Sequence, residues 1–127
     1  MGMNRYRSMA AFREELRHFL LRSETAARTV GITPRQHLLL LQIAGSDDGT
    51  TTVSDLVQKL ALTQSAVTEL VQRAEQAGLV ARAQSTQDGR VVNLSVTKVG
   101  AAKLAAITGK LDAERTHLRE LVEGLGR

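Results

Sequence analysis

Two short segments with helical periodicity, residues 53–60 and 64–77, stand almost end to end in this chain. In the second segment apolar residues recur every three or four positions, so they form one side of a helix and leave the other side polar. Thr63 is suited to cap its first turn, and only Ala61 and Leu62 separate that cap from the first helix. So short a link forces a sharp crossing and leaves the polar face of the second helix projecting. We therefore predict a helix-turn-helix.

A β-hairpin is predicted directly behind the second helix. Gly78 ends that helix, residues 79–84 can form one strand, and residues 91–96 alternate apolar and polar side chains as a second. Asp88 and Gly89 lie between the strands, and Asp-Gly is a strong hairpin signal because glycine tolerates positive φ. Helix, turn, helix and hairpin in this order form a unit that can grip DNA with a helix and a β ribbon.

The flanking segments are predicted to be helical. Residues 9–30 and 98–125 carry apolar stripes, and a capping box opens a helix over residues 34–44. Residues 45–50 are expected to form a polar loop. Thr108-Gly109 is the only candidate break in the last segment, which is therefore either one kinked helix or two. The predicted fold class is mainly α with a small β-hairpin: a winged helix-turn-helix flanked by helices.

Six short motifs occur in a fixed order across roughly residues 31–100. They are Gly31-Ile32-Thr33-Pro34-Arg35-Gln36, Val53-Ser54-Asp55-Leu56, Leu62-Thr63-Gln64-Ser65-Ala66-Val67-Thr68, Gly78-Leu79-Val80-x-Arg82, Asp88-x-Arg90 and Leu94-Ser95-Val96-Thr97-x-x-Gly100. In this order and spacing they resemble the MarR family of bacterial winged helix-turn-helix transcriptional regulators. The resemblance implies one domain over residues 1–127, with a winged core at 31–97 and dimerisation helices at 8–30 and 98–125. It also implies a homodimer that places one recognition helix per subunit in the major groove.

The polar face of the second helix supplies the candidate DNA contacts. Hydroxyl, amide and carboxylate groups that can reach base edges belong to Ser65, Thr68, Glu69 and Gln72. Three neighbours suit phosphate contacts instead, namely Thr63, Gln64 and Arg73. The alternative is an ordinary solvated helix face, which any surface helix shows. The short turn and the hairpin beside it favour DNA contact.

The hairpin adds three candidate residues to this interface. Arg90, at its tip, is the best placed to enter a minor groove or to reach its phosphates. Asp88 can hold an arginine in position, and both Arg82 and Arg90 are possible partners. The alternative for Asp88 is a role in forming the turn before Gly89, and the two roles are compatible.

A helix-turn-helix usually works as a dimer that reaches two half-sites about one DNA turn apart, so we expect a pseudo-palindromic operator. The apolar stripes of the terminal helices exceed what so small a domain needs for its own core. The residues assigned to dimerisation are Phe12, Leu16, Phe19, Leu111, Leu118, Leu121 and Leu125. The alternative is that both stripes cover the core of a single chain. The segment after Gly100 is shorter than the usual family pattern.

Charge does not by itself indicate a nucleic-acid partner. Residues 1–35 carry a net charge of +4, whereas residues 50–100 hold five basic and four acidic side chains, a net of +1. Any binding to DNA therefore depends on where a few charges lie.

Other function classes have little support. The histidines are scattered and cysteine is absent, so no metal, cofactor or disulfide is expected, and no catalytic constellation stands out. The chain has no predicted membrane span and is expected to be cytoplasmic. The resemblance implies a small-molecule effector pocket, which Phe19, Arg35 and His37 could line although each is more often structural. We predict a DNA-binding repressor that acts by promoter occlusion; the main alternative is a winged helix that binds another protein.

Overall fold

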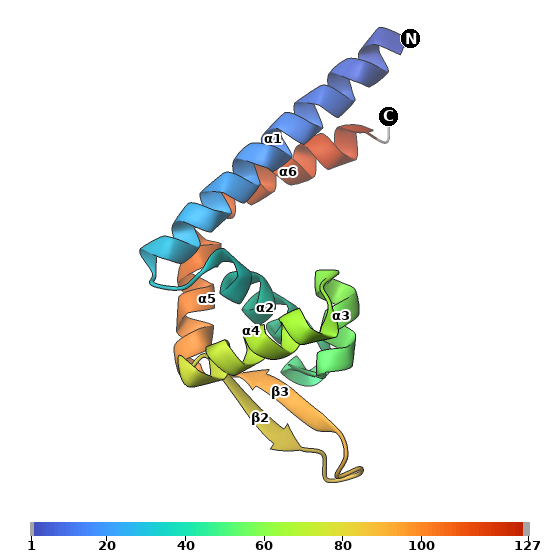
Figure 1. Cartoon of the computed structure of the whole chain (residues 1–127). Helices are drawn as coiled ribbons and strands as arrows, with labels where there is room; N and C mark the ends of the chain where they lie inside the picture. Colours follow the sequence, from blue (N-terminus) through green and yellow to red (C-terminus); the bar gives the residue numbers. More distant parts are fainter. Residues whose placement is uncertain (1, 126–127) are drawn as a thin grey trace.

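Residues 2–125 are described by the computed structural model, which shows six α-helices and a three-stranded antiparallel sheet over that range (Figure 1). In chain order the elements are α1 (Gly2–Thr29), α2 (Pro34–Ala44), a 3₁₀ turn (Asp47–Gly49), β1 (Thr50–Thr51), α3 (Val53–Leu60), α4 (Gln64–Gln76), β2 (Val80–Gln84), β3 (Val92–Val96), α5 (Lys98–Lys110) and α6 (Asp112–Leu125). The predicted fold class is confirmed: this is a winged helix-turn-helix with helices on both sides.

One apolar core lies where α2, α3, α4, α5 and the sheet meet. Its largest fully buried side chains are Leu39, Leu40, Ile43, Leu56, Val67, Val71, Leu79, Leu94 and Ile107. Burying each such side chain contributes about 1.5–3 kcal/mol relative to leaving it in water. The periodicity that predicted α3 and α4 therefore reflects the faces that these two helices turn toward this core.

Threonine residues cap the N-termini of several of these helices. The Thr33 hydroxyl accepts from the Gln36 amide at 3.1 Å, and the Gln36 side chain accepts from the Thr33 amide at 3.0 Å, which completes the predicted capping box. Thr97 caps α5 by accepting from the Gly100 amide at 3.1 Å. Each cap pairs amides that would otherwise lack a partner at the start of a helix.

Gly100 lies where α5 passes over the start of the wing. A Cβ atom at this position would stand 2.4 Å from the Leu79 carbonyl oxygen and 2.8 Å from a methyl group of Val96. The Leu79 carbonyl is in turn held by the Thr97 amide at 3.0 Å, so it cannot easily move away. Glycine at position 100 thus lets α5 pack closely against the wing.

The sheet has one strand more than the sequence indicated. Residues 45–50 were expected to form a loop, but Thr50–Thr51 forms β1 and pairs with β3 in the order β1-β3-β2. Thr51 lies opposite Leu94, and Leu94 lies opposite Arg82 on the other side. Two residues are too few to show the alternation by which a strand is recognised, which is why the prediction was wrong here.

The tip of the wing contains the expected turn at Asp88-Gly89, closed by a hydrogen bond of 2.9 Å from the Val91 amide to the Asp88 carbonyl, but its backbone conformation differs from the expected one. Gly89 does not adopt a positive φ, whereas Gly78, which ends α4, does so at 76°. The loop between β2 and β3 is longer than a two-residue turn, and a hydrogen bond of 2.8 Å from the Ser85 amide to the Val91 carbonyl closes it. Side-chain oxygens of Ser85 and Asp88 accept from backbone amides inside this loop, so the tip does not need glycine at positive φ.

Helices α1 and α6 lie side by side and form an arm that extends from the winged core, with both ends of the chain at its far end (Figure 1). Helix α1 begins at Gly2, well before the predicted residue 9. Residues 98–125 form two helices, and the break falls at Leu111 instead of Thr108-Gly109. Leu111 leaves the helical path because its side chain turns into the core, where it is 5% exposed.

Candidate nucleic-acid interface

Helix α4 carries the residues predicted to touch DNA. Thr63 is its N-cap, and its hydroxyl accepts from the Ala66 amide at 3.1 Å, as the sequence predicted. Val67, Val71 and Ala74 bury the opposite face of the helix against the core. The polar face is therefore fixed in direction by packing and points away from the core.

The individual candidates on α4 are nearly all solvent-exposed. This holds for Gln64, Ser65, Glu69, Gln72 and Arg73, while Thr68 is half-buried. All of them lie on the polar side of α4, so the structure brings the predicted set together. The Thr68 hydroxyl has less room than its neighbours and is the least available of the group.

The link between α3 and α4 has an unusual backbone conformation. Ala61 adopts the left-handed conformation, with φ of 54° and ψ of 43°. Residues with a side chain pay roughly 1–2 kcal/mol for this conformation, which glycine tolerates. The left-handed residue makes the sharp turn by which α4 crosses α3, and this crossing leaves the polar face of α4 exposed.

At the wing tip, Asp88 holds Arg90. One oxygen of Asp88 accepts from the Arg90 amide at 3.0 Å and lies 3.3 Å from the Arg90 Nε. Asp88 thus forms the turn and positions an arginine at once. The Arg90 side chain is 92% exposed, which leaves its outer nitrogens free to meet a ligand.

Arg82 is placed differently from the other predicted wing residue. Its Nε lies 3.2 Å from a carboxylate oxygen of Glu75, near the end of α4, so Asp88 is not its partner. Glu75 was missed from the sequence because it looked like one more exposed residue on a polar helix face. Its pairing depends on how β2 returns past α4, which no local pattern reveals.

Every arginine of residues 50–100 is thus paired with a carboxylate. Arg73 and Glu69 are 2.8 Å apart with the spacing of successive helical turns, Arg82 pairs with Glu75, and Arg90 with Asp88. The side chains in these pairs are largely exposed, and such pairs stabilise a fold by only about 0.2–1 kcal/mol. Their main effect is to offset positive charge where the candidate DNA contacts lie.

The residues predicted to mediate dimerisation lie along the arm. Phe12, Leu16 and Phe19 on α1 and Leu118, Leu121 and Leu125 on α6 are half-buried, and only Leu111 at the break is fully buried. Helices α1 and α6 of one chain pack against each other. Several large apolar side chains remain exposed on the arm, namely Met3, Tyr6, Met9, Leu20, Leu21 and Val122.

A buried histidine joins the arm to the winged core. His37 on α2 is 5% exposed, and its Nδ1 lies 3.3 Å from the hydroxyl of Ser23 on α1. Burial lowers the pKa of His37 below its ordinary value of 6.5, because desolvation disfavours the charged ring. On the other side of the junction, the Lys103 ammonium donates to the Val30 carbonyl at 2.6 Å.

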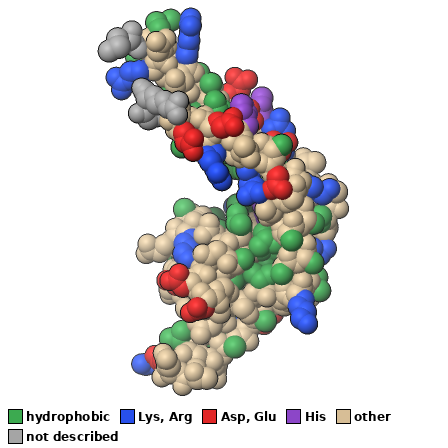
Figure 2. All heavy atoms as spheres, turned by 180° about the vertical axis from the view of Figure 1, so that it is seen from behind, with side chains coloured by type: hydrophobic (Ala, Val, Ile, Leu, Met, Phe, Trp, Pro, Cys, Tyr) green, Lys and Arg blue, Asp and Glu red, His purple; other side chains and the backbone are tan. Residues whose placement is uncertain are grey.

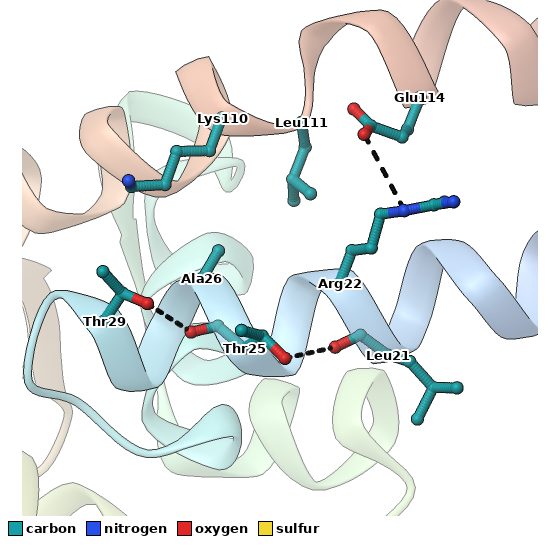
Figure 3. Close-up of a pocket in the computed structure, with 8 residues that line it drawn as sticks. All are labelled: Leu21, Arg22, Thr25, Ala26, Thr29, Lys110, Leu111 and Glu114. Carbon is teal, nitrogen blue, oxygen red and sulfur yellow. Dashed lines mark hydrogen bonds and ion pairs between the residues drawn. The ribbon is translucent and has the colours of Figure 1, made fainter.

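A shallow hollow of about 390 Å³ lies where the arm meets α5 (Figure 3). It is lined by Leu21, Arg22, Thr25, Ala26, Thr29, Lys110, Leu111 and Glu114. None of Phe19, Arg35 and His37, the residues considered for an effector pocket, lines it. His37 is in the interior, and Arg35 lines a separate hollow of about 470 Å³ beside Glu69 and Arg73.

Residues 2–125 contain neither a cluster of metal ligands nor a membrane-spanning helix. No three histidine, aspartate or glutamate side chains of this range gather closely enough to hold a metal ion. In the same range, none of the helices has the length and apolar character needed to cross a membrane.

Comparison with known proteins gives a matching family model, a related sequence and solved structures of the same fold. A model of the MarR family matches residues 30–91. The HTH-type transcriptional repressor MdtR of Bacillus subtilis is 35% identical over 77 residues, which make up 61% of this chain and 48% of the repressor. The chain thus spans about half the length of that relative.

Solved structures extend the similarity beyond the winged core. The YusO protein of Bacillus subtilis matches 86% of this chain and 76% of its own, with a TM-score of 0.66 and 26% identity. A mutant of S. aureus MepR bound to an oligodeoxyribonucleotide matches 88% of this chain and 81% of its own, with a TM-score of 0.71 and 25% identity.

Proposed function

Because the chain belongs to the MarR family, as its ordered motifs predicted, we propose that it is a sequence-specific regulator of transcription that binds double-stranded DNA. The observation that carries this proposal is the exposed polar face of α4, held in direction by its buried face and set beside a wing tipped by Arg90. A relative of the same fold is bound to an oligodeoxyribonucleotide, which supports DNA as the partner.

The contacts divide between the two parts of this interface. We assign base edges in the major groove to Ser65, Thr68, Glu69 and Gln72, and phosphates to Thr63, Gln64 and Arg73. The Thr63 hydroxyl oxygen already accepts from the Ala66 amide to cap α4, and its O–H remains to donate to a phosphate oxygen. Arg90, positioned by Asp88, enters the minor groove or contacts its phosphates, and Arg82 acts nearer the base of the wing.

We further propose that the working unit is a homodimer on a pseudo-palindromic operator. The arm supports this, since it leaves large apolar side chains such as Met3, Tyr6 and Val122 in contact with water. A second copy whose arm interlocks with the first would cover them and would set two α4 helices one DNA turn apart. The half-buried stripes on α1 and α6 are the residues assigned to that interface.

Repression by promoter occlusion is the mode of action proposed for this dimer. The relative MdtR is named as a repressor, and a dimer seated on a promoter would exclude polymerase without any catalytic step. No catalytic activity is proposed. Such a protein acts on chromosomal DNA, and we place it in the cytoplasm.

An effector that relieves repression would fit the hollow between α1 and the α5–α6 junction (Figure 3). Arg22 is paired there with Glu114 at 3.9 Å, so Lys110 is the cation that would meet a small anionic compound, whose apolar body would contact Leu21, Ala26 and Leu111. A ligand there would alter the angle between the arm and the winged core, and hence the spacing of the two α4 helices.

The proposal is tested by titrating the chain against duplex DNA from upstream of its own gene and against random duplexes of equal length, at several salt concentrations. We expect the upstream duplex to bind more tightly at every salt concentration, with affinity falling as salt rises because bound phosphates release counterions. A protein-interaction module would show no preference for any duplex, and that result would refute the proposal.

Two substitutions sharpen this test by separating the roles. Gln72→Ala should reduce the preference for the upstream duplex at particular base pairs by about 1–3 kcal/mol, with little change on random DNA. Arg90→Ala should weaken binding to both duplexes alike. Equal effects of the two variants on both duplexes would show that the division of roles is wrong.

A further inference from the structure

The charges of the winged unit, residues 50–100, are arranged in a way that its net charge does not reveal. Its three arginines each have a carboxylate partner in the same unit, at 2.8 Å, 3.2 Å and 3.3 Å. Figure 2, which views the molecule from behind the side on which Figure 1 shows α4, shows charged side chains crowded on the arm. The arginines of the winged unit are therefore already offset by carboxylates, and its other two cations are Lys59 and Lys98.

Glu75 differs from Glu69 and Asp88 because it pairs with an arginine on another secondary-structure element. Glu69 and Asp88 pair with arginines four and two residues away on their own helix and loop. Glu75, near the end of α4, pairs with Arg82 on β2 and so joins the recognition helix to the wing. Arg82 lies two residues along β2 from the buried Val80, and therefore on the sheet face turned toward α4.

We propose that Glu75 acts as a restraint on DNA affinity: it occupies Arg82 and thereby keeps the winged unit from binding arbitrary duplexes tightly. The inference rests on the proposed DNA-binding function. Sequence-independent affinity depends on the number of free cations that can replace counterions on phosphates. A carboxylate that neutralises one of so few arginines lowers that affinity, while base readout by α4 stays intact. Selectivity rises because binding to random DNA falls more than binding to the operator.

The side chains are accessible enough for this role. Arg82 and Glu75 are 44% and 40% exposed, so the pair lies at the surface in water. An exposed ion pair is weak, and a guanidinium released from it would be free to reach a phosphate. Removing the Glu75 charge would therefore add one available cation and one positive charge to the interface without creating a buried gap.

The test uses the full chain with Glu75→Gln, Arg82→Ala and the double variant. The matched control is Asp112→Asn, which removes an equally charged residue from an exposed pair with Arg115 on α6, a helix outside the winged unit. Affinity for random and upstream duplexes is measured over a series of salt concentrations, and thermal unfolding is recorded for each variant.

We expect Glu75→Gln to bind random duplexes roughly three- to tenfold more tightly, with a salt slope steeper by about one. Arg82→Ala should weaken binding, because it leaves Glu75 unpaired, and the double variant should return close to the parent chain. Asp112→Asn should change affinity for random DNA by less than about twofold, since the arginine that it releases is Arg115 on α6 and not one of α4 or the wing.

Opposite signs for the two single variants distinguish this restraint from a structural strut. If Glu75 only braced the wing, Glu75→Gln and Arg82→Ala would weaken binding alike and lower the unfolding temperature, and the inference would be overturned. An equal gain in Asp112→Asn would also overturn it, because bulk charge would then explain the effect. If the parent chain prefers no duplex yet Glu75→Gln still binds all DNA more tightly, the restraint stands and sequence-specific regulation fails.

Discussion

The winged core and the arm solve the problem of burying apolar side chains in different ways. In the core, Leu39, Leu56 and Leu94 are removed from water within a single chain. In the arm, no side chain of α6 is fully buried, and α1 exposes Met3, Tyr6 and Met9. The winged core thus has a fully buried interior in one copy, although its surface also exposes Leu38, Leu41 and Val99, whereas α6 of the arm has none.

This difference suggests a division of labour between the two regions. A rigid core is what a reading surface needs, because contacts to base edges depend on a fixed direction for α4. An arm that stays partly uncovered is suited to a partner. In the proposed dimer, the arm would set the distance between the two α4 helices. The join between them is narrow and is formed by α1, the start of α2 and the α5–α6 break.

The largest expected effect is the loss of a core side chain. Leu56→Ala should lower the free energy of unfolding by about 2–5 kcal/mol, because the side chain is fully buried and its removal leaves a cavity. Urea denaturation monitored by circular dichroism measures this loss. Val122→Ala, on α6 and 49% exposed, is the matched arm variant and should change the value by less than about 0.5 kcal/mol in the dissociated chain.

Measuring Leu56→Ala and Val122→Ala at low and high protein concentration tests whether the core and the arm differ in this way. The loss in Leu56→Ala should be the same at low and high concentration, since its contacts lie within one chain. If Val122→Ala were as damaging as Leu56→Ala in dilute solution, the arm would be as complete as the core and the comparison would fail.

A smaller effect is expected at the join, where His37 is buried against Ser23. Because burial lowers the pKa of His37 in the folded chain, the unfolded chain takes up the proton first as pH falls. The stability from the neutral ring is therefore complete above pH 6.5 and decreases as pH falls below it, down to the pKa of the folded state.

His37→Gln should remove this dependence. Urea denaturation at about pH 7.5 and about pH 5.5 should show the parent chain losing more stability than the variant over that interval, which lies around the ordinary histidine pKa. Carboxylates that titrate in the same range affect both proteins equally and cancel in the difference. Parallel pH profiles would mean that the join does not hold a neutral histidine.

Much of this fold could be predicted from the sequence because local patterns and the structure agree. The caps at Thr33, Thr63 and Thr97 need only residues within three positions, and the stripes of α3 and α4 reflect one buried face each. The direction of the recognition face followed from the length of the link at Ala61.

The features that escaped prediction depend on residues far apart in the chain. Strand β1 exists because β3 lies beside it, and α5 ends at Leu111 because the core accepts that side chain. The pair of Glu75 and Arg82 requires the return of β2 past α4. Gly89 lies in the expected turn, which a hydrogen bond of 2.9 Å from the Val91 amide to the Asp88 carbonyl closes, but it does so without the expected positive φ.

We propose that one chain carries a complete DNA-contact surface on α4 and the wing, and that two chains are needed to bind an operator. The most direct test is the mass of the complex formed with the upstream duplex, measured by sedimentation velocity as chain is added. We predict that the selective complex contains two chains per duplex. Footprinting should show protection over two half-sites about one helical turn apart. A selective complex with one chain per duplex, or none that is selective, would contradict the account.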